Sequence, residues 1–114
     1  MAFQDDYGHR IAVIPFSGEN TVIMSQDLTS DIQVIFRDQM FSIQPVWTGG
    51  PTGTLKLEGS LDKNNWCLIP STTSTVNGPS SIIWDLGHSA IPYFRVKYER
   101  SGGSGILKVY ILVK

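Results

Sequence analysis

Asp85, His88 and the serines around them are the residues of this chain whose types could support nucleophilic catalysis. They stand in the segment SSIIWDLGHS, and a serine, a histidine and an aspartate in contact can activate a hydroxyl group. The segment lacks the GxSxG pattern that places a nucleophilic serine on a strained turn. Aspartate and glycine in a short polar segment such as DLGHS are typical of a turn, in which Asp85 bonds the turn backbone and Gly87 takes a positive φ. The sequence therefore predicts a turn at DLGHS and no catalytic residue.

The side chains that could bind a metal ion are few and widely spaced. Two histidines and the single cysteine match no zinc pattern, and we expect Cys67 to be a small buried apolar residue. The segment LDKNNW offers oxygen atoms from Asp62, Asn64 and Asn65, but a calcium loop has more carboxylates at a fixed spacing. We therefore expect no metal ion and no cofactor, and we interpret LDKN as a turn that caps a pair of strands.

The tryptophans raise carbohydrate binding as a second kind of chemistry, because sugar rings stack on exposed aromatic side chains flanked by amides and carboxylates. Trp47 borders the glycine loop TGGPTG and Trp66 follows two asparagines, so these two are the candidate ligand-binding residues. Tryptophan also fills the cores of small sandwiches. Trp84 lies within an apolar segment that suggests a core position. We expect two of the three tryptophans to be structural, and the sequence leaves open which two.

Length and composition limit the class of protein. A chain of 114 residues with 41% hydrophobic residues fits one globular domain with one core. Its apolar runs are much shorter than the roughly 20 residues of a membrane helix. Its formal charge of −1 gives no overall attraction to nucleic acid, and MAFQDDYGHR lacks the apolar stretch of a signal peptide. We expect neither nucleic acid nor a membrane as partner, and we expect synthesis in a reducing cytoplasm, because one cysteine cannot form an internal disulfide.

Alternation of polar and apolar residues predicts that most of the chain forms β-strands. It is clearest in TLKLE, FRVKYE and ILKVYILV, and a strand with this pattern has one buried face and one exposed face. Turn residues interrupt the chain every ~8–12 residues, and the glycines of SGGSG suit a β-hairpin loop between the last two strands. The sequence predicts an all-β, single-domain antiparallel β-sandwich of jelly-roll type with eight or nine short strands. Residues 1–9 would form an N-terminal arm and residues 10–114 the sandwich.

The outward residues of the closing strand are too apolar for a surface that meets only water. Ile106, Tyr110 and Leu112 would share one side of that strand with Lys108. A strand that is apolar on both sides is typical of a strand covered on both sides. We therefore expect a second subunit or another protein to cover this side.

Phe3 and Tyr7 of the arm precede the first strand and have no obvious place in the sandwich core. We expect a neighbouring subunit or the edge of the sheet to order them.

Charged residues alternate with apolar ones in the other strands. If GTLKLEGS, PYFRVKYER and GILKVYILVK are neighbours in one sheet, their charged side chains share its outer side: Lys56, Glu58, Arg95, Lys97, Glu99 and Lys108. Glu58 would then pair with Arg95 or Lys97, a contact worth about 0.2–1 kcal/mol. Both a solvated face and a docking surface fit this pattern, and the apolar neighbours of Lys108 favour docking.

Two runs of sequence, FSIQPVWTGGPTGTLKLEGSLD and YFRVKYERSGGSGILKVYILVK, resemble a recurrent pattern in small bacteriophage virion proteins. These proteins look like discoidin-type or jelly-roll β-sandwiches. The resemblance covers about residues 30–114 and implies a non-enzymatic structural role in the virion, such as capsid decoration or cement, or a component of the neck, tail or a fibre. The partners would be further copies of this chain and other virion proteins, such as the major capsid protein. The discoidin-like shape implies an alternative, a carbohydrate- or host-surface-binding module of a tail or fibre.

Together these inferences predict a homo-oligomeric virion protein made in the host cytoplasm. Capsid decoration is the favoured role, because the chain is one domain with a short arm and has no coiled coil or fibrous repeat. Its contacts would involve Phe3, Tyr7, Ile106, Lys108, Tyr110 and Leu112.

Overall fold

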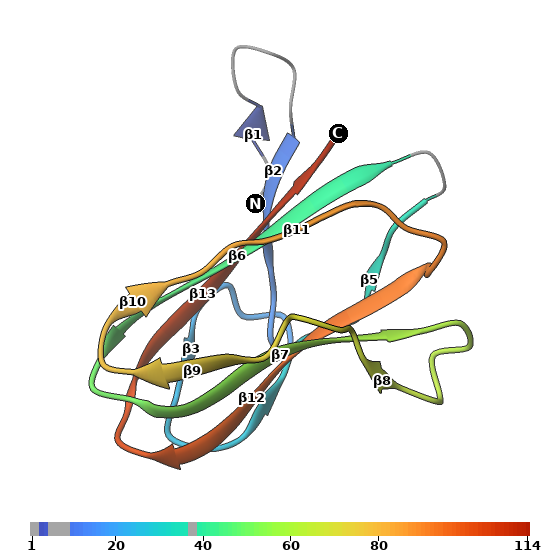
Figure 1. Cartoon of the computed structure of the whole chain (residues 1–114). Coiled ribbons are helices and arrows are strands. Elements are labelled where there is room, and N and C mark those ends of the chain that lie inside the picture. The colour runs from blue at the N-terminus through green and yellow to red at the C-terminus, as the bar shows by residue number, and fades with distance from the viewer. Residues whose placement is uncertain (1–2, 5–9, 37–38) are drawn as a thin grey trace.

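Two antiparallel β-sheets packed face to face form this protein (Figure 1). The structure is a computed structural model, and it describes residues 3–4, 10–36 and 39–114. Those residues form thirteen strands, and the predicted all-β antiparallel sandwich is confirmed. Within the same ranges there is no helix long and apolar enough to cross a membrane.

Each sheet is assembled from segments that lie far apart in the sequence. The first sheet contains β1 (Phe3–Gln4), β2 (Arg10–Ile14), β3 (Val22–Ile23), β6 (Met40–Gly49), β10 (Ser80–Ser81), β11 (Trp84–His88) and β13 (Gly105–Val113). The second contains β4 (Leu28–Thr29), β5 (Gln33–Val34), β7 (Thr52–Ser60), β8 (Cys67–Leu68), β9 (Ser74–Asn77) and β12 (Tyr93–Gly102). In Figure 1 the long strands β6 and β13 of the first sheet run above β7 and β12 of the second.

The order of the strands is that of a jelly roll. β2 and β3 both pair with β13, β10 and β11 with β6, β4 and β5 with β12, and β8 and β9 with β7. Counting each of these four pairs as one interrupted strand, and adding the four long strands β6, β7, β12 and β13, gives eight positions. In chain order they lie 1-8-3-6 in the first sheet and 2-7-4-5 in the second, which is a double Greek key. The predicted eight or nine strands correspond to these positions.

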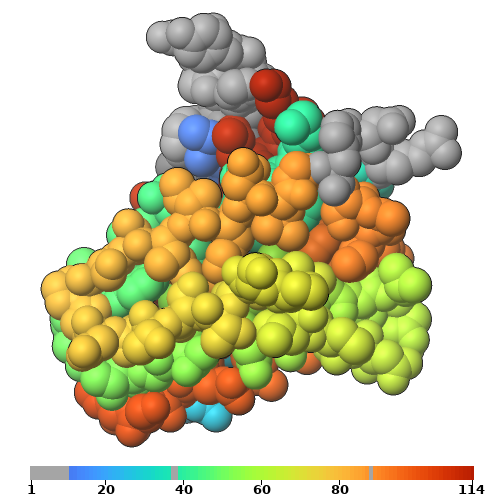
Figure 2. Space-filling view, viewed as in Figure 1, coloured from blue at the N-terminus to red at the C-terminus, as the bar shows by residue number. Residues whose placement is uncertain are grey.

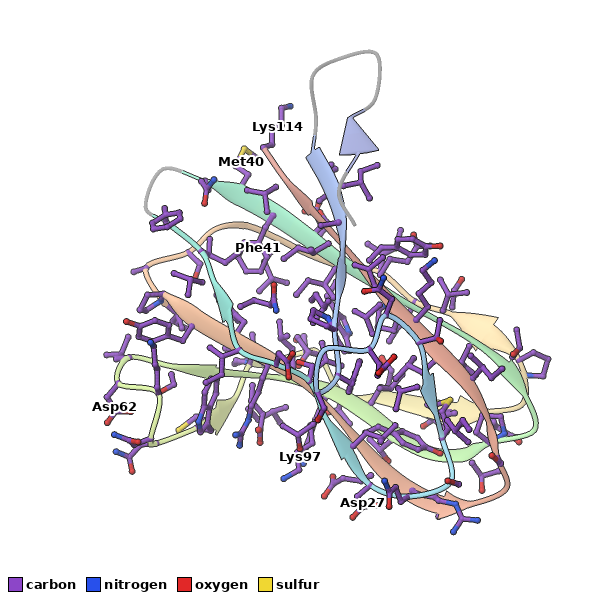
Figure 3. All side chains as sticks on the ribbon, turned by 180° about the vertical axis from the view of Figure 1, so that it is seen from behind. Asp27, Met40, Phe41, Asp62, Lys97 and Lys114 are labelled. Carbon is purple, nitrogen blue, oxygen red and sulfur yellow. The ribbon has the colours of Figure 1, made fainter. Side chains whose placement is uncertain are left out.

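Apolar residues at alternate strand positions fill the space between the sheets. Val96, Val109 and Ile111 are 0%, 0% and 5% exposed, as the alternation predicted. Phe41 of β6 and Phe94 of β12 meet across the two sheets with their ring centroids 4.7 Å apart. Phe41 projects into this interior in Figure 3. The sandwich therefore has one continuous core between its two layers.

Hydroxyl side chains complete the hydrogen bonding where two of the outer strands are interrupted. Between β4 and β5, Ser30 Oγ accepts a hydrogen bond from the backbone N–H of Val96 on β12 at 2.8 Å. Between β8 and β9, Thr72 Oγ1 accepts one from the backbone N–H of Leu57 on β7 at 3.2 Å. Both hydroxyls are buried, and a buried N–H without a partner is costly. The chain can leave the sheet at these points without exposing the central strands.

Pro45 explains the interruption between β10 and β11. Its carbonyl accepts a hydrogen bond from the backbone N–H of Ile82, so this carbonyl faces the β10–β11 side. The nitrogen of a strand residue points to the same side as its carbonyl, and proline has no N–H to donate there. On its other side β6 pairs with β13 without a break. Phe41, Ile43 and Val46 are all apolar, but their spacing does not let them share one face of a regular strand. Val46 points outward, while Phe41, Ile43 and Pro45 point inward.

Two of the predicted turns have a different structure. SGGSG is not a hairpin loop, because β12 and β13 belong to different sheets and the segment crosses between them. Its glycines allow backbone to approach backbone: a Cβ on Gly105 would overlap the carbonyl oxygen of Thr48. The first four residues of DLGHS belong to strand β11, which ends at His88 and carries a bulge between Asp85 and Gly87. Gly87 has the predicted positive φ, 61°.

The turn predicted at LDKN is confirmed. Asp62 Oδ1 accepts hydrogen bonds from the backbone N–H groups of Asn64 and Asn65, at 2.9 and 2.8 Å. Asp62 Oδ2 accepts one from the side-chain amide of Asn65 at 2.7 Å. The hydroxyl of Ser60 donates a further one to Oδ1. The backbone N–H of Asn65 contributes most to holding the pKa of Asp62 well below its usual range.

Candidate functional site

The outer faces of the two sheets differ in their chemistry. In the second sheet the two central strands, β7 and β12, have a charged outer side, because they lie side by side and their charged residues alternate with core residues. Arg95 Nε donates to Glu58 Oε1 at 2.7 Å, and Lys56 Nζ lies 2.7 Å from Glu99 Oε1. The predicted pairing of Glu58 with Arg95 is confirmed.

Lys108 does not belong to this charged face. The sequence pattern predicted that it would share a face with Lys56 and Arg95, but β13 lies in the first sheet and not beside β7 and β12. The reason is the segment SGGSG. It was predicted to be a hairpin loop within one sheet, but it carries the chain from the second sheet to the first. Lys108 therefore stands among apolar residues.

The outer face of the first sheet is apolar, and we call it the apolar face. Its side chains come from β2, β3, β13, β6 and the segment that joins β10 to β11. Its apolar members are Ile11, Val13, Ile23, Met40, Val46, Ile83, Ile106, Tyr110 and Leu112. Ile23, Ile83 and Ile106 are 62%, 62% and 52% exposed, although isoleucine is a residue usually found inside proteins. A contiguous surface of this kind is typical of an interaction site.

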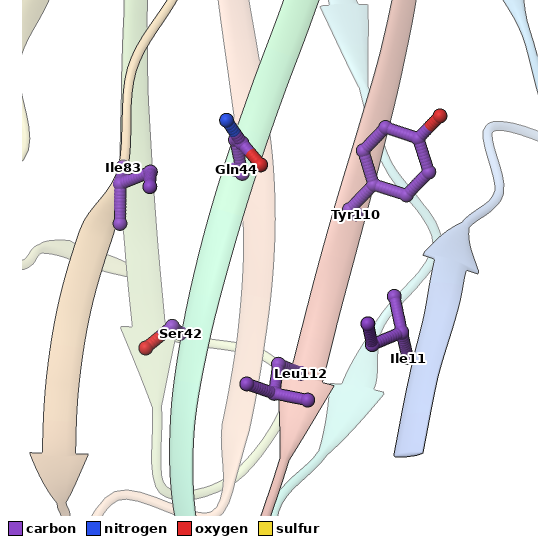
Figure 4. Close-up of a pocket in the computed structure, with 6 residues that line it drawn as sticks. All are labelled: Ile11, Ser42, Gln44, Ile83, Tyr110 and Leu112. Carbon is purple, nitrogen blue, oxygen red and sulfur yellow. The ribbon is translucent and has the colours of Figure 1, made fainter. Parts of the chain in front are cut away.

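A shallow hollow of about 390 Å³ lies in the apolar face. Figure 4 shows its lining residues on neighbouring strands, with Gln44 and Ser42 on β6 near the middle. The lining residues are Ile11, Ser42, Gln44, Ile83, Tyr110 and Leu112. They come together because β2, β13 and β6 are neighbours and each strand turns alternate residues outward. The hollow can accept an apolar side chain, with Ser42 and Gln44 as polar contacts.

Two opposite charges lie on the apolar face, on either side of the hollow. Lys108 Nζ lies 5.3 Å from the ring centroid of Tyr110, so the lysine folds over the ring as a cation–π contact. Asp85 is exposed, and its Oδ1 accepts a hydrogen bond from the hydroxyl of Ser42 at 2.9 Å. Lys114 lies at the end of the face beside Met40, as Figure 3 shows, and the backbones of these two residues are hydrogen-bonded to each other.

The four predicted contact residues of the closing strand are brought together on this face. Ile106 is exposed, and Lys108, Tyr110 and Leu112 are half-buried, while the residues between them lie in the core. Phe3 is in β1 and pairs with Ile11 at the edge of the same sheet. Tyr7 lies outside the described residues.

The tryptophans predicted as ligand-binding residues have different environments. Trp47 is 2% exposed, its ring belongs to the core, and its indole N–H donates to the carbonyl of Gly78. A ligand therefore cannot stack on it, and with Trp84 it makes up the two structural tryptophans that we expected. Trp66 is half-buried at the surface, and the guanidinium of Arg95 lies 4.2 Å from its ring centroid. One face of this ring is already covered.

A second concavity of about 480 Å³ lies where β7 runs into the Asp62 turn. Figure 2 shows the yellow to orange segments, which follow this turn, running across the side of the molecule that faces the viewer. The concavity is lined mainly by apolar side chains, among them Leu61, Leu68, Ile69 and Ile91. Cys67 also lines it and is exposed, so the expectation that this cysteine is buried was wrong. Both residues of the short strand β8 are exposed, and this strand lies at the edge of the second sheet.

Sequence reasoning missed several residues of the hollow, namely Ile11, Ser42, Gln44 and Ile83. In RIAVIP, strand alternation places Ile11 and Val13 on one face and Ala12 and Ile14 on the other. This pattern could have predicted that β2 contributes Ile11 to the hollow. Ile83 had no such signal, because it lies in the interruption between β10 and β11. Within the described ranges no group of three or more His, Cys, Asp or Glu residues could hold a metal ion.

No protein-family model and no curated protein sequence matches this chain. The crystal structure of PirA is similar over 96% of both chains, with a TM-score of 0.51 and 12% sequence identity. A chain in the structure of infectious bursal disease virus, Gt strain, is similar over 92% of this chain and 31% of its own length, with a TM-score of 0.50 and 10% identity. A third structure, described as CBM4 structure and function, has a TM-score of 0.46, which is too low to carry an argument. At this level of identity the likeness shows the fold alone, a β-sandwich.

Proposed function

We propose that this protein is a non-enzymatic structural protein of a phage virion, most simply a capsid decoration or cement protein, that acts through its apolar face. The observation that carries this proposal is the contrast between the two sheets. The outer side of the second sheet carries ion pairs such as Glu58–Arg95. The outer side of the first sheet carries isoleucines that are more than half exposed. When another protein surface covers a face of this kind, its apolar side chains leave water, and this burial stabilises the assembly.

The fold is consistent with this role. Jelly rolls occur in viral capsid domains and also in lectins and cupins, and a chain from a virus structure shares the sandwich. This is an analogy at the level of the fold, and the apolar face is the stronger argument. The partners that we propose are further copies of this chain and a capsid surface such as that of the major capsid protein.

The test is the double variant Tyr110→Glu with Leu112→Glu. Both residues line the hollow, and two carboxylates there would prevent burial of the face. We expect a folded protein by circular dichroism that sediments as a monomer and no longer co-sediments with capsids. The matched control, Thr73→Glu with Thr75→Glu, adds the same charge at exposed positions near the edge of the other sheet and should assemble normally.

Two outcomes would contradict the proposal. Normal assembly of the Tyr110→Glu, Leu112→Glu variant would show that the apolar face is not the interface. Unfolding of that variant, together with unfolding of the milder Tyr110→Ser, Leu112→Ser variant, would show that these residues support the sandwich itself.

Carbohydrate or host-surface binding is the second candidate, with Trp66 as its specific observation. Trp66 lies at the surface, where it contacts Arg95 and its indole N–H donates to the carbonyl of Lys63, and sugars are bound by rings flanked by such polar groups. The ring face that Arg95 does not cover would stack on a sugar. Titration of oligosaccharides while the indole fluorescence is recorded, with Trp66→Ala as the control, tests this candidate.

A further inference from the structure

We propose that two copies of this chain pack face to face through the apolar face about a two-fold axis that passes by Gln44, with Lys108 of each copy opposite Asp85 of the other. The inference rests on the proposed function, since it names the partner that covers the face. It goes beyond it by fixing which residues meet.

The strand register places the two charges symmetrically about Gln44. Gln44 is opposite Tyr110 of β13, and Lys108 is opposite Val46, two residues further along β6. On the other side of β6, Asp85 is opposite Ser42, two residues in the other direction. Lys108 and Asp85 thus lie one strand to either side of Gln44 and two residues before and after it. Gln44 is midway between them.

Consider two copies whose apolar faces meet, related by a two-fold axis that lies in the plane between the two sheets. Such an axis can place Lys108 of one copy over Asp85 of the other. If it passes by Gln44 and runs perpendicular to the line from Lys108 to Asp85, each lysine lies opposite the partner's aspartate. A two-fold interface uses the same patch on both subunits, so one contact of this kind implies a second, equivalent one. The same operation brings Tyr110 of each copy over the hollow of the other, between Leu112 and Ser42.

The charges on the apolar face favour a second copy of this chain as the partner, rather than an unrelated protein. Within the apolar face the described residues contribute one cation and one anion between the strand ends, Lys108 and Asp85. Burying either charge without a partner costs several kcal/mol, whereas an opposite charge directly across the interface offsets this cost. A second copy supplies both opposite charges at once.

The size of the face also suits a dimer. Four neighbouring strands at about 4.8 Å spacing and nine residues at about 3.3 Å each cover roughly 600 Å² in projection. The accessible area is larger than this projected area, because side chains and the rim add to it. Stable interfaces bury about 800 Å² of accessible area per partner.

Charge exchange tests the contact. Lys108→Glu and Asp85→Lys each place like charges opposite each other, and each should weaken self-association, measured by sedimentation equilibrium, by about tenfold or more. The exchanged double variant, Lys108→Glu with Asp85→Lys, restores the opposite pairs and should recover most of the wild-type affinity. Lys97→Glu makes the same change of charge on the outer face of the other sheet and should leave the affinity unchanged. If Asp85→Lys does not fold, Asp85→Asn replaces it, because the amide oxygen still accepts the hydrogen bond from Ser42. This neutral variant should weaken self-association less than a reversal of charge such as Lys108→Glu does.

The outcomes separate this inference from the proposed function. If the single variants associate as tightly as wild type, or if the exchanged variant is no better than either single one, the two-fold packing is wrong. If wild type is a monomer at high micromolar concentration but binds capsids through Tyr110 and Leu112, the proposed function stands and the partner is the capsid rather than a second copy.

Discussion

Thr72 Oγ1 accepts the backbone N–H of Leu57 at 3.2 Å and donates its own proton to the carbonyl of Ile69 at 2.7 Å. This side chain takes the place of the strand that is interrupted between β8 and β9. Ser30 does the same for Val96 on the other edge of that sheet. The backbone N–H groups of Leu57 on β7 and Val96 on β12 therefore keep partners, although the outer neighbours of these strands are made of short pieces.

Thr72→Val should destabilise the protein by about 1–3 kcal/mol, because valine has the shape of threonine and leaves the buried N–H of Leu57 without a partner. Thr73→Val, at the exposed neighbouring position, should change the free energy of unfolding by no more than about 0.5 kcal/mol. Urea denaturation of both variants measures the difference. Equal stability of the two would mean that the hydroxyl of Thr72 does not matter.

Gly105→Ala should be strongly destabilising, by about 2 kcal/mol or more, because its Cβ would overlap the backbone carbonyl of Thr48 where two crossing segments touch. Gly50 lies in the adjacent crossing segment, and a Cβ on it meets nothing within 4 Å. Gly50→Ala should therefore be nearly neutral. Thermal unfolding of the two variants distinguishes backbone crowding from the general effect of replacing a loop glycine.

Ile111→Ala should cost about 2–5 kcal/mol, because Ile111 is 5% exposed and its loss leaves a cavity between the sheets. Leu112 is the next residue but points to the apolar face, so Leu112→Ala should cost about 1 kcal/mol or less in the dissociated protein and mainly weaken assembly. A cost for Ile111→Ala below about half a kcal/mol would show that the two faces of β13 are assigned the wrong way round.

Asp62 should stay ionised at pH values where an ordinary aspartate, with a pKa of about 3.9, is protonated. Hydrogen bonds, first from the backbone N–H of Asn65 and then from that of Asn64, lower its pKa in the folded protein. A lowered pKa contributes stability that is present above the unfolded value and is lost as the pH falls through the folded one. An NMR titration of the amide signals of Asn64 and Asn65 should show no step near pH 3.9. Asp62→Asn, which keeps an acceptor but has no charge to titrate, is the control.

The sequence by itself determined the fold class and the two sides of each long strand. Period-2 alternation identifies Val96, Val109 and Ile111 as core residues wherever the chain is folded as a strand, because successive side chains point to opposite faces. The apolar character of Ile106, Tyr110 and Leu112 is likewise a property of the sequence, and so is the turn at Asp62, whose hydrogen bonds are all made within a few residues.

Tertiary structure alone decided which strands are neighbours. Glycine in SGGSG is compatible both with a hairpin and with a crossing between sheets, and the crossing follows from the pairing of β12 with β7 and of β13 with β6, which lie far away in the chain. That choice moved Lys108 from the charged face to the apolar one, and it brought Ile11, Gln44 and Ile83 beside Tyr110. Local patterns specify the face on which a side chain lies, but partners across a sheet depend on contacts between distant segments, which no short stretch of sequence contains.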